Sequence, residues 1–162
     1  MKYRKTLMLV LMFGVLLSIS CRKTTEVSSS YAYTPQESVC LSADPDGSVV
    51  LRVWGSGANK ADAIEHAKKK ALQEVLFSGI NKGLKTIDPL LYEVNAEEKY
   101  SYYFSVFFQD GGEYLNYITT DKSKRDSDVK AISDFQDKYG VVVTVYRDAL
   151  RQDLIKNGIL KP

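Results

Sequence analysis

The feature that most constrains the fold is an alternating apolar segment that leads through two glycines into a long amphipathic segment. In residues 48–54 the side chains at positions 49, 51 and 53 share one face, which predicts a β-strand. Gly55-Ser56-Gly57 is expected to end this strand. Asn59 is then placed to cap a helix that runs to about Ser78, with Asp62 completing a variant capping box. The expected buried stripe of this helix consists of Ile64, Ala67, Ala71, Leu72, Val75 and Leu76.

The aromatic segment YSYYFSVFF at residues 100–108 admits two interpretations. Asn95 and Glu98 form a helix-start pattern, and several rings after them share a helical face. The same segment also alternates as a strand does, and its residue types favour β structure. We interpret it as a helix because of the cap pattern and the acidic first turn. Residues 81–95 before it are expected to form a connection.

The C-terminal part supplies two further predicted strands and a short helix. Residues 129–135 and 141–147 have strand patterns, and the short connection between them suits an antiparallel hairpin. Asp148 is expected to cap a last helix, in which Leu150 and Leu154 lie one turn apart. The predicted order is therefore β–α–α–β–β–α. It indicates an α+β fold, with a small antiparallel sheet of about three strands and helices packed on one face.

Two segments of the sequence resemble a family of small bacterial envelope proteins. They are VVLRVWGSGANKADAIEHAKKKALQEVL and VVVTVYRDALRQDLIKNGIL. Both are similar to the twenty-kilodalton membrane lipoproteins and to the N-terminal domain of flagellar assembly protein T. The resemblance implies a non-catalytic envelope component that acts through protein contacts, and residues 81–120 have no clear counterpart in it. The positions that carry it are Gly55, Gly57, Ala63, Ala67, Ala71, Leu150, Leu154 and Gly158.

An apolar segment that ends in a cysteine, LMLVLMFGVLLSISC, occupies residues 7–21. Three basic residues and no acidic residue precede it, as in a secretory signal peptide. The apolar run is too short to span a bilayer comfortably, because a transmembrane helix needs about 20 apolar residues. Its end, Leu17-Ser18-Ile19-Ser20-Cys21, resembles a bacterial lipobox. The resemblance implies that residues 1–20 are a lipoprotein signal peptide and that Cys21 carries lipid, with Arg22 favouring the outer membrane. A non-lipidated secreted protein and an uncleaved anchor are the alternatives.

The segment after the cysteine has the composition of a solvated tether. Residues 21–46 are rich in Ser, Thr, Lys, Glu and Pro, and we expect a lipidated flexible tether that leads into a single domain at residues 47–162. Loss of residues 1–20 removes three of the 22 basic residues and none of the 20 acidic ones. The mature chain is then nearly neutral, which gives no reason to expect nucleic acid as a partner. Cys40 is expected to be a small, partly buried hydrophobe, with a reactive thiol as the alternative, or a disulfide partner of Cys21 if that residue carries no lipid.

The residue patterns that indicate catalysis are absent from the sequence. Gly55-Ser56-Gly57 lacks the further glycines and the lysine of nucleotide-binding loops, and it lacks the flanking glycines of a nucleophile elbow. His66 is the only histidine, so a metal site or a hydrolase triad has too few ligands. A thiol nucleophile made by Cys40 and His66 has no local signature in its favour. We therefore expect no enzyme activity, no cofactor and no metal.

Aromatic side chains are the remaining candidates for a functional surface. Most of them are expected to fill the core, because aromatic rings bury large areas. Those that stay exposed are expected to contact a protein partner or, alternatively, a glycan such as peptidoglycan. The candidate residues are Trp54, Tyr92, Tyr100, Tyr102, Tyr103 and Phe108. The sequence thus predicts a membrane-anchored envelope lipoprotein that acts as a structural or protein-interaction module.

Overall fold

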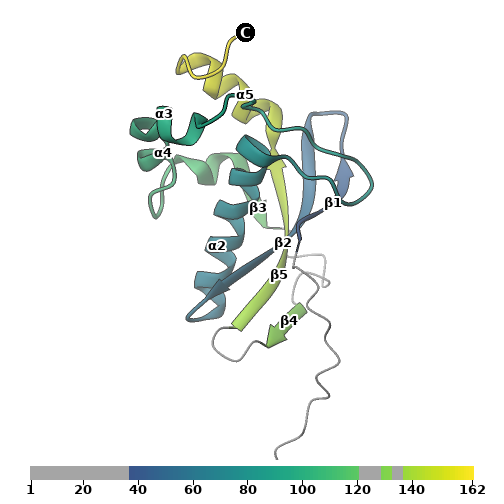
Figure 1. The fold of residues 1–162 in the computed structure, drawn as a ribbon. Coiled ribbons are helices and arrows are strands. Elements are labelled where there is room, and N and C mark those ends of the chain that lie inside the picture. Colours follow the sequence, from purple (N-terminus) through teal and green to yellow (C-terminus); the bar gives the residue numbers. More distant parts are fainter. Residues whose placement is uncertain (1–36, 121–128, 133–136) are drawn as a thin grey trace, which may run out of the picture. The chain divides into compact units, whose positions relative to one another are not determined.

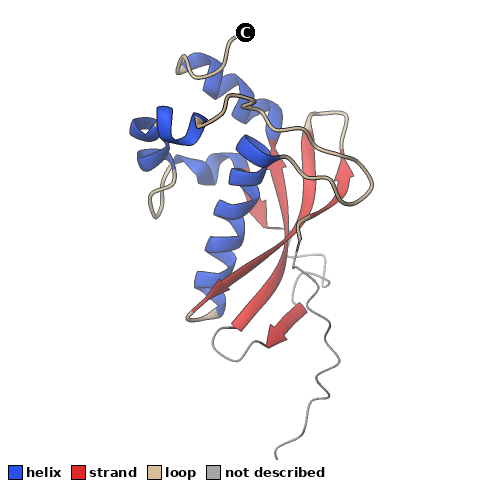
Figure 2. Ribbon diagram, viewed as in Figure 1, coloured by secondary structure: helices blue, strands red, loops and turns tan. Residues whose placement is uncertain are grey.

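Five antiparallel strands form one sheet, and the helices pack against one of its faces (Figure 1, Figure 2). The structure is a computed structural model that describes residues 37–120, 129–132 and 137–162. The predicted signal peptide and Cys21 lie outside the described residues. Within the described ranges, no helix combines the length and the apolar composition needed to cross a bilayer.

The sheet is four strands wide although it contains five strands. Its order is β1 (Val39–Ala43), β2 (Ser48–Gly57) and β5 (Asp137–Tyr146), and the outer edge of β5 is shared by β3 (Ile118–Thr120) and β4 (Val129–Ile132). β3 pairs with the C-terminal part of β5, and β4 pairs with its N-terminal part. The predicted α+β fold with a small antiparallel sheet is confirmed, and the sheet is larger than the predicted three strands because of β1 and β3.

The central strands β2 and β5 are longer than predicted and pair along their whole length. The pairs run from Ser48 with Tyr146 to Gly57 with Asp137. Gly55-Ser56-Gly57 therefore continues β2 instead of ending it, and residues 137–140 belong to β5 instead of a connection. The predicted alternation is confirmed. The core face carries the buried pairs Val49–Val145, Leu51–Val143 and Val53–Val141.

Helix α2 (Lys60–Gln73) and the π-helical turn η1 (Glu74–Ser78) together form the long helix predicted to run to Ser78. The Asn59 side chain accepts a hydrogen bond from the backbone amide of Asp62 at 3.0 Å and donates one to the Asp62 carboxylate at 2.8 Å. The predicted cap is therefore confirmed. Ile64 is only half-buried. The fully buried stripe is Ala63, Ala67, Ala71, Leu72, Val75 and Leu76.

Helix α2 lies directly on β2 where that strand carries glycine. A Cβ atom at Gly55 would lie 1.9 Å from the carbonyl oxygen of Ala63 and 2.7 Å from the amide nitrogen of Ala67. A Cβ atom at Gly57 would lie 2.6 Å from the Ala63 amide nitrogen. These distances leave no space for a side chain. The two glycines therefore permit close packing of the helix on the sheet. They form neither a turn nor a phosphate-binding loop.

The structured part of the chain begins earlier than the sequence indicated. Residues 39–43 lie within the predicted tether, but they form strand β1 antiparallel to β2. Cys40 is 1% exposed and pairs with Leu51, and its thiol donates a hydrogen bond to the Ser42 carbonyl oxygen at 3.5 Å. A register shift between Cys40 and Ser42 interrupts the alternation that identifies a strand. Cys40 is therefore a hydrophobe of the core, and it is more deeply buried than the partly buried side chain that was predicted.

The aromatic segment is helical, which excludes the strand alternative. It forms α3 (Ala96–Lys99) and α4 (Ser101–Phe107), and the 3-10 helix η2 (Glu113–Tyr117) follows. Asn95 begins α3 as predicted, but its side chain makes no capping bond. Its backbone is left-handed, with φ of 62°, instead of the extended conformation of a capping residue.

The final helix, α5 (Arg147–Lys156), packs its apolar side against the core. Leu150 and Leu154 are both fully buried, as their spacing predicted. The helix begins one residue before Asp148, which therefore lies in the first turn and is not the cap. In that position its negative charge still complements the helix dipole.

Candidate protein-interaction surface

The inner face of α4 anchors this helix in the core. Phe104 and Phe107 are 4% and 1% exposed. Their rings contact Phe77, Tyr103 and Tyr117, with centroid separations of 5.0 Å for Phe77–Phe104, 5.5 Å for Tyr103–Phe107 and 5.8 Å for Phe107–Tyr117. Aromatic pairs at these separations stabilise a fold beyond the area that they bury.

A hydrogen bond between side chains joins α4 to α5. The Tyr103 hydroxyl donates to the Asp153 carboxylate at 2.5 Å. Burial and this carboxylate raise the pKa of Tyr103 far above its ordinary value of 10.0, so the phenol remains a donor at physiological pH. Burial and the same carboxylate also raise the pKa of Tyr117. This bond and the ring contacts hold α4 in one orientation.

The outer face of α4 carries two large apolar side chains. Tyr102 is 67% exposed and Val106 is 55% exposed. They are four residues apart in the helix, so they lie on the same face. The inner rings are fixed in the core, and the outer face is therefore presented to solvent on a rigid support.

A groove of about 370 Å³ lies beside the start of α3. Leu91 and Ala96, which are 5% and 3% exposed, and the half-buried Phe77 give it an apolar lining. Tyr92 and Val94 also border it, and these two side chains are 75% and 83% exposed. The groove therefore combines a buried apolar base with two exposed apolar side chains.

The π-helical turn at the end of α2 fixes the chain segment that forms the groove. Gly79 donates its amide to Glu74, which leaves the next two carbonyl groups without their usual helical partners. Those carbonyls, of Val75 and Leu76, accept from the amides of Leu90 at 3.0 Å and Leu91 at 2.9 Å. Residues 90 and 91 are thereby attached to the end of the long helix.

An ion pair closes the loop that borders the groove. Lys99 donates to the Glu93 carboxylate at 2.6 Å, and its ammonium group lies 5.0 Å from the centre of the Tyr100 ring. The Tyr100 hydroxyl also approaches Glu93, at 3.5 Å. These contacts are exposed and individually weak, but together they connect both ends of residues 93–100.

The six predicted ring residues do not form one patch. They are Trp54, Tyr92, Tyr100, Tyr102, Tyr103 and Phe108, and only Tyr92 and Tyr102 are strongly exposed. Tyr100, Tyr103 and Phe108 are partly buried against the core. Trp54 is half-buried on the sheet face opposite α2. Its indole lies next to Gly140, where a Cβ atom added to the glycine would be 3.3 Å from the ring.

Two aliphatic residues belong to this surface and were missed by the sequence analysis. Val94 is more exposed than Tyr92, and Val106, although less exposed than Tyr102, still exposes more than half of its surface. Val106 follows Tyr102 by four residues, so the helical interpretation already placed both opposite the core-facing rings. A search restricted to aromatic side chains could not find these valines.

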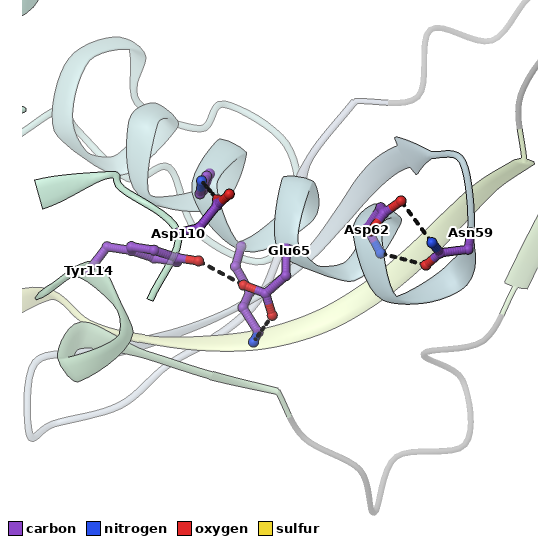
Figure 3. A network of polar contacts seen from close by, with 7 residues as sticks. Asn59, Asp62, Glu65, Asp110 and Tyr114 are labelled. Carbon is purple, nitrogen blue, oxygen red and sulfur yellow. Dashed lines mark hydrogen bonds and ion pairs between the residues drawn. The ribbon is translucent and has the colours of Figure 1, made fainter. Parts of the chain in front are cut away.

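A polar depression of about 440 Å³ lies beside α2 on another part of the domain. Tyr114 donates its hydroxyl to Glu65 at 2.7 Å, and Lys68 donates to the same carboxylate at 2.6 Å (Figure 3). Lys69 donates to Asp110 at 2.7 Å and keeps the pKa of that carboxyl below its ordinary value. These bonds attach η2 and the loop before it to α2, which is a structural role.

The described residues do not assemble a catalytic group from Cys40 and His66. Cys40 is buried in the core, whereas His66 is exposed on α2 with its Nδ1 atom 2.5 Å from the Ser56 carbonyl oxygen. Among the residues that the structure describes, no cluster of His, Cys, Asp and Glu side chains is arranged to hold a metal ion.

Replacing Glu65 with glutamine is expected to remove stability that depends on pH. Burial raises the pKa of Glu65, but the hydrogen bonds from Lys68 and Tyr114 outweigh it, and the net pKa lies below 4.5. A lowered pKa stabilises the fold above the unfolded-state pKa, and this contribution is lost as the pH falls through the folded-state pKa. The side chain is 43% exposed, so we expect less than about 1 kcal/mol.

Denaturant unfolding near neutral pH and in acid measures this contribution. The stability difference between the wild type and Glu65→Gln should shrink in acid, and an equal difference at both pH values would contradict the assignment. Tyr114→Phe is a matched variant, because it retains a ring that is 1% exposed and removes only the hydroxyl donor.

No protein-family model, curated protein or solved structure matches this chain. The resemblance to the membrane lipoproteins and to flagellar assembly protein T therefore stays a prediction.

Proposed function

We propose that this protein is a lipid-anchored envelope protein, attached through Cys21, whose α+β domain binds a protein partner and catalyses no reaction. The observation that carries the binding role is a set of four exposed apolar side chains, here called the apolar band. It consists of Tyr92, Val94, Tyr102 and Val106, which are 55–83% exposed. The lipobox-like residues 17–21 support the anchor, and Arg22 favours the outer membrane as its location.

The four side chains of the apolar band all lie between residues 92 and 106, in the loop before α3 and on α4. Single exposed apolar residues are normal, but four large ones within residues 92–106 favour an interaction site. The segment is also held rigidly by the inner rings of α4 and by the bonds to η1. Binding through a preformed surface loses little conformational entropy, which favours specific recognition.

A protein partner fits the apolar band better than a glycan does. Sugar rings stack on flat aromatic faces, and the band has only two rings, with Tyr92 in the loop before α3 and Tyr102 on α4. Among the ring pairs in the described ranges, none includes Tyr92, Tyr102 or Trp54. The two valines of the band suit apolar side chains of a protein.

Intact mass spectrometry of the protein purified from membranes tests the anchor. We expect a chain that begins at Cys21 and carries the added mass of acyl groups. Cys21→Ala should lack this mass and should no longer sediment with membranes. A wild-type chain with a bare thiol at position 21, or with another first residue, would overturn the anchor.

Photo-crosslinking in intact cells tests the partner. A photoreactive residue at position 102 is expected to give one discrete crosslinked protein. The control places the same residue at Leu84, which is 83% exposed and lies outside the apolar band. Equal crosslinking at both positions, or none at position 102, would contradict the proposal. Saturable binding to isolated cell-wall polysaccharide that is lost in Tyr102→Ala would favour the glycan alternative.

A further inference from the structure

We infer that the groove beside α3 binds a cationic segment of the partner, which places an apolar side chain in the groove between flanking lysine or arginine residues. This inference rests on the proposed function and adds the chemistry of the partner and its place on the domain.

The apolar part of the inference comes from the shape and lining of the groove. Its volume of about 370 Å³ falls at the lower end of the range for ligand pockets, about 300–1,000 Å³. The base of the groove is apolar and consists of Leu91, Ala96 and Phe77. Two exposed apolar side chains, those of Tyr92 and Val94, lie beside it. An inserted leucine or phenylalanine side chain would remove this apolar surface from water.

The cationic part comes from the charges around the groove. Two carboxylates, those of Glu93 and Glu97, line the groove, and no lysine, arginine or histidine lines it. Glu93 is paired with Lys99. Neither Glu97 nor Glu98 has an ion pair or a side-chain hydrogen bond within the described structure, and Glu97 lines the groove. A lysine or arginine next to the inserted side chain would meet this negative charge.

The same charges disfavour the other occupants of an exposed apolar groove. An anionic membrane surface is repelled by carboxylates and attracted by basic residues, and the lining of the groove contains carboxylates and no basic residue. Two copies of this groove would bring acidic residues face to face, which is destabilising. A cationic protein segment is the occupant that satisfies both the apolar base and the acidic border.

Asn95 adds a hydrogen-bonding group to the groove. It is the only residue other than glycine with positive φ in the described part of the chain, and it lines the groove between exposed Val94 and buried Ala96. Its side-chain amide makes no capping bond and has no other hydrogen bond in the described structure. A free amide can both donate to and accept from the backbone of a bound segment.

Peptide binding to the full-length, detergent-solubilised protein tests the inference. The probe is a fluorescent peptide with a central Leu-Phe pair and two lysines on each side, measured by anisotropy in a non-ionic detergent. Two control peptides replace the lysines with glutamates or the Leu-Phe pair with two serines. We expect the probe to bind at least about tenfold more tightly than either control, and to weaken as salt is added.

Four surface variants locate the site. Val94→Ser and Glu97→Lys should each weaken probe binding at least about fivefold, which is about 1 kcal/mol. Their controls are Leu84→Ser, which removes an apolar side chain equally exposed at 83%, and Glu113→Lys, which reverses an exposed charge outside the groove. Both controls should bind as the wild type does. Circular dichroism confirms that each variant is folded.

Several results would overturn the inference. They are no saturable binding of the probe, equal binding of the glutamate peptide, or unchanged binding by Val94→Ser and Glu97→Lys. The proposed function is judged separately by crosslinking at position 102. A discrete crosslinked partner together with unchanged probe binding by the groove variants would reject the groove and leave the protein-interaction role in place.

Discussion

Replacing Gly55 with valine is expected to lower the free energy of unfolding by at least about 3 kcal/mol, which is a large fraction of the roughly 5–15 kcal/mol that stabilises a domain. The position faces α2, where even a Cβ atom would lie 1.9 Å from the Ala63 carbonyl oxygen and 2.7 Å from the Ala67 amide nitrogen. Both neighbours are helix backbone, so the helix must move off the sheet. Equilibrium denaturation followed by circular dichroism measures the loss.

Ser56→Val is the matched control for this variant. Ser56 is the next residue of β2, and its side chain lies on the opposite face of the sheet from α2. Valine favours strands, so we expect a change within about 1 kcal/mol there. If Gly55→Val unfolded at the wild-type denaturant concentration, α2 could not pack on β2 as described.

The strand and helix at the centre of the domain could be predicted because their signals are local. The alternation in residues 48–54, the cap at Asn59 and the alanine-rich stripe each need only neighbouring residues to be recognised. The role of Gly55-Ser56-Gly57 could not be predicted in the same way. A glycine that permits close packing has the same sequence as a glycine that ends a strand, and only the position of α2 distinguishes them.

The edge strands were missed because non-local pairing defines them. β1 has five residues with a register shift, and β3 has three residues. The register shift interrupts the alternation in β1, and β3 is too short to show one, so each is defined as a strand by its pairing with β2 or β5. The predicted sheet was therefore too narrow, although its class and its covered face were correct.

The candidate surface could be predicted only in part. A helix over residues 100–107 separates inward Phe104 and Phe107 from outward Tyr102 by spacing alone. The groove could not be predicted, because it depends on hydrogen bonds from Leu90 and Leu91 to the end of the long helix and on the left-handed backbone of Asn95. None of these features has a signature within its own segment.

Replacing Phe107 with alanine is expected to lower the free energy of unfolding by about 3–5 kcal/mol. Its side chain is 1% exposed, and its ring contacts four others, so alanine would leave a cavity among rings that are themselves fixed. The closest of these rings belongs to Phe108, with the two centroids 4.9 Å apart. Denaturant unfolding at neutral pH measures the effect.

Tyr102→Ala distinguishes the core of this segment from its surface. Tyr102 is 67% exposed, so its loss should change stability by no more than about 0.5 kcal/mol. A strand over residues 100–108 would instead place Tyr102 and Phe104 on one face and Phe107 on the other. Comparable losses in Tyr102→Ala and Phe104→Ala, with little loss in Phe107→Ala, would contradict the helix. The expected pattern leaves Tyr102→Ala folded, so any loss of polysaccharide binding in that variant reports on the surface and not on unfolding.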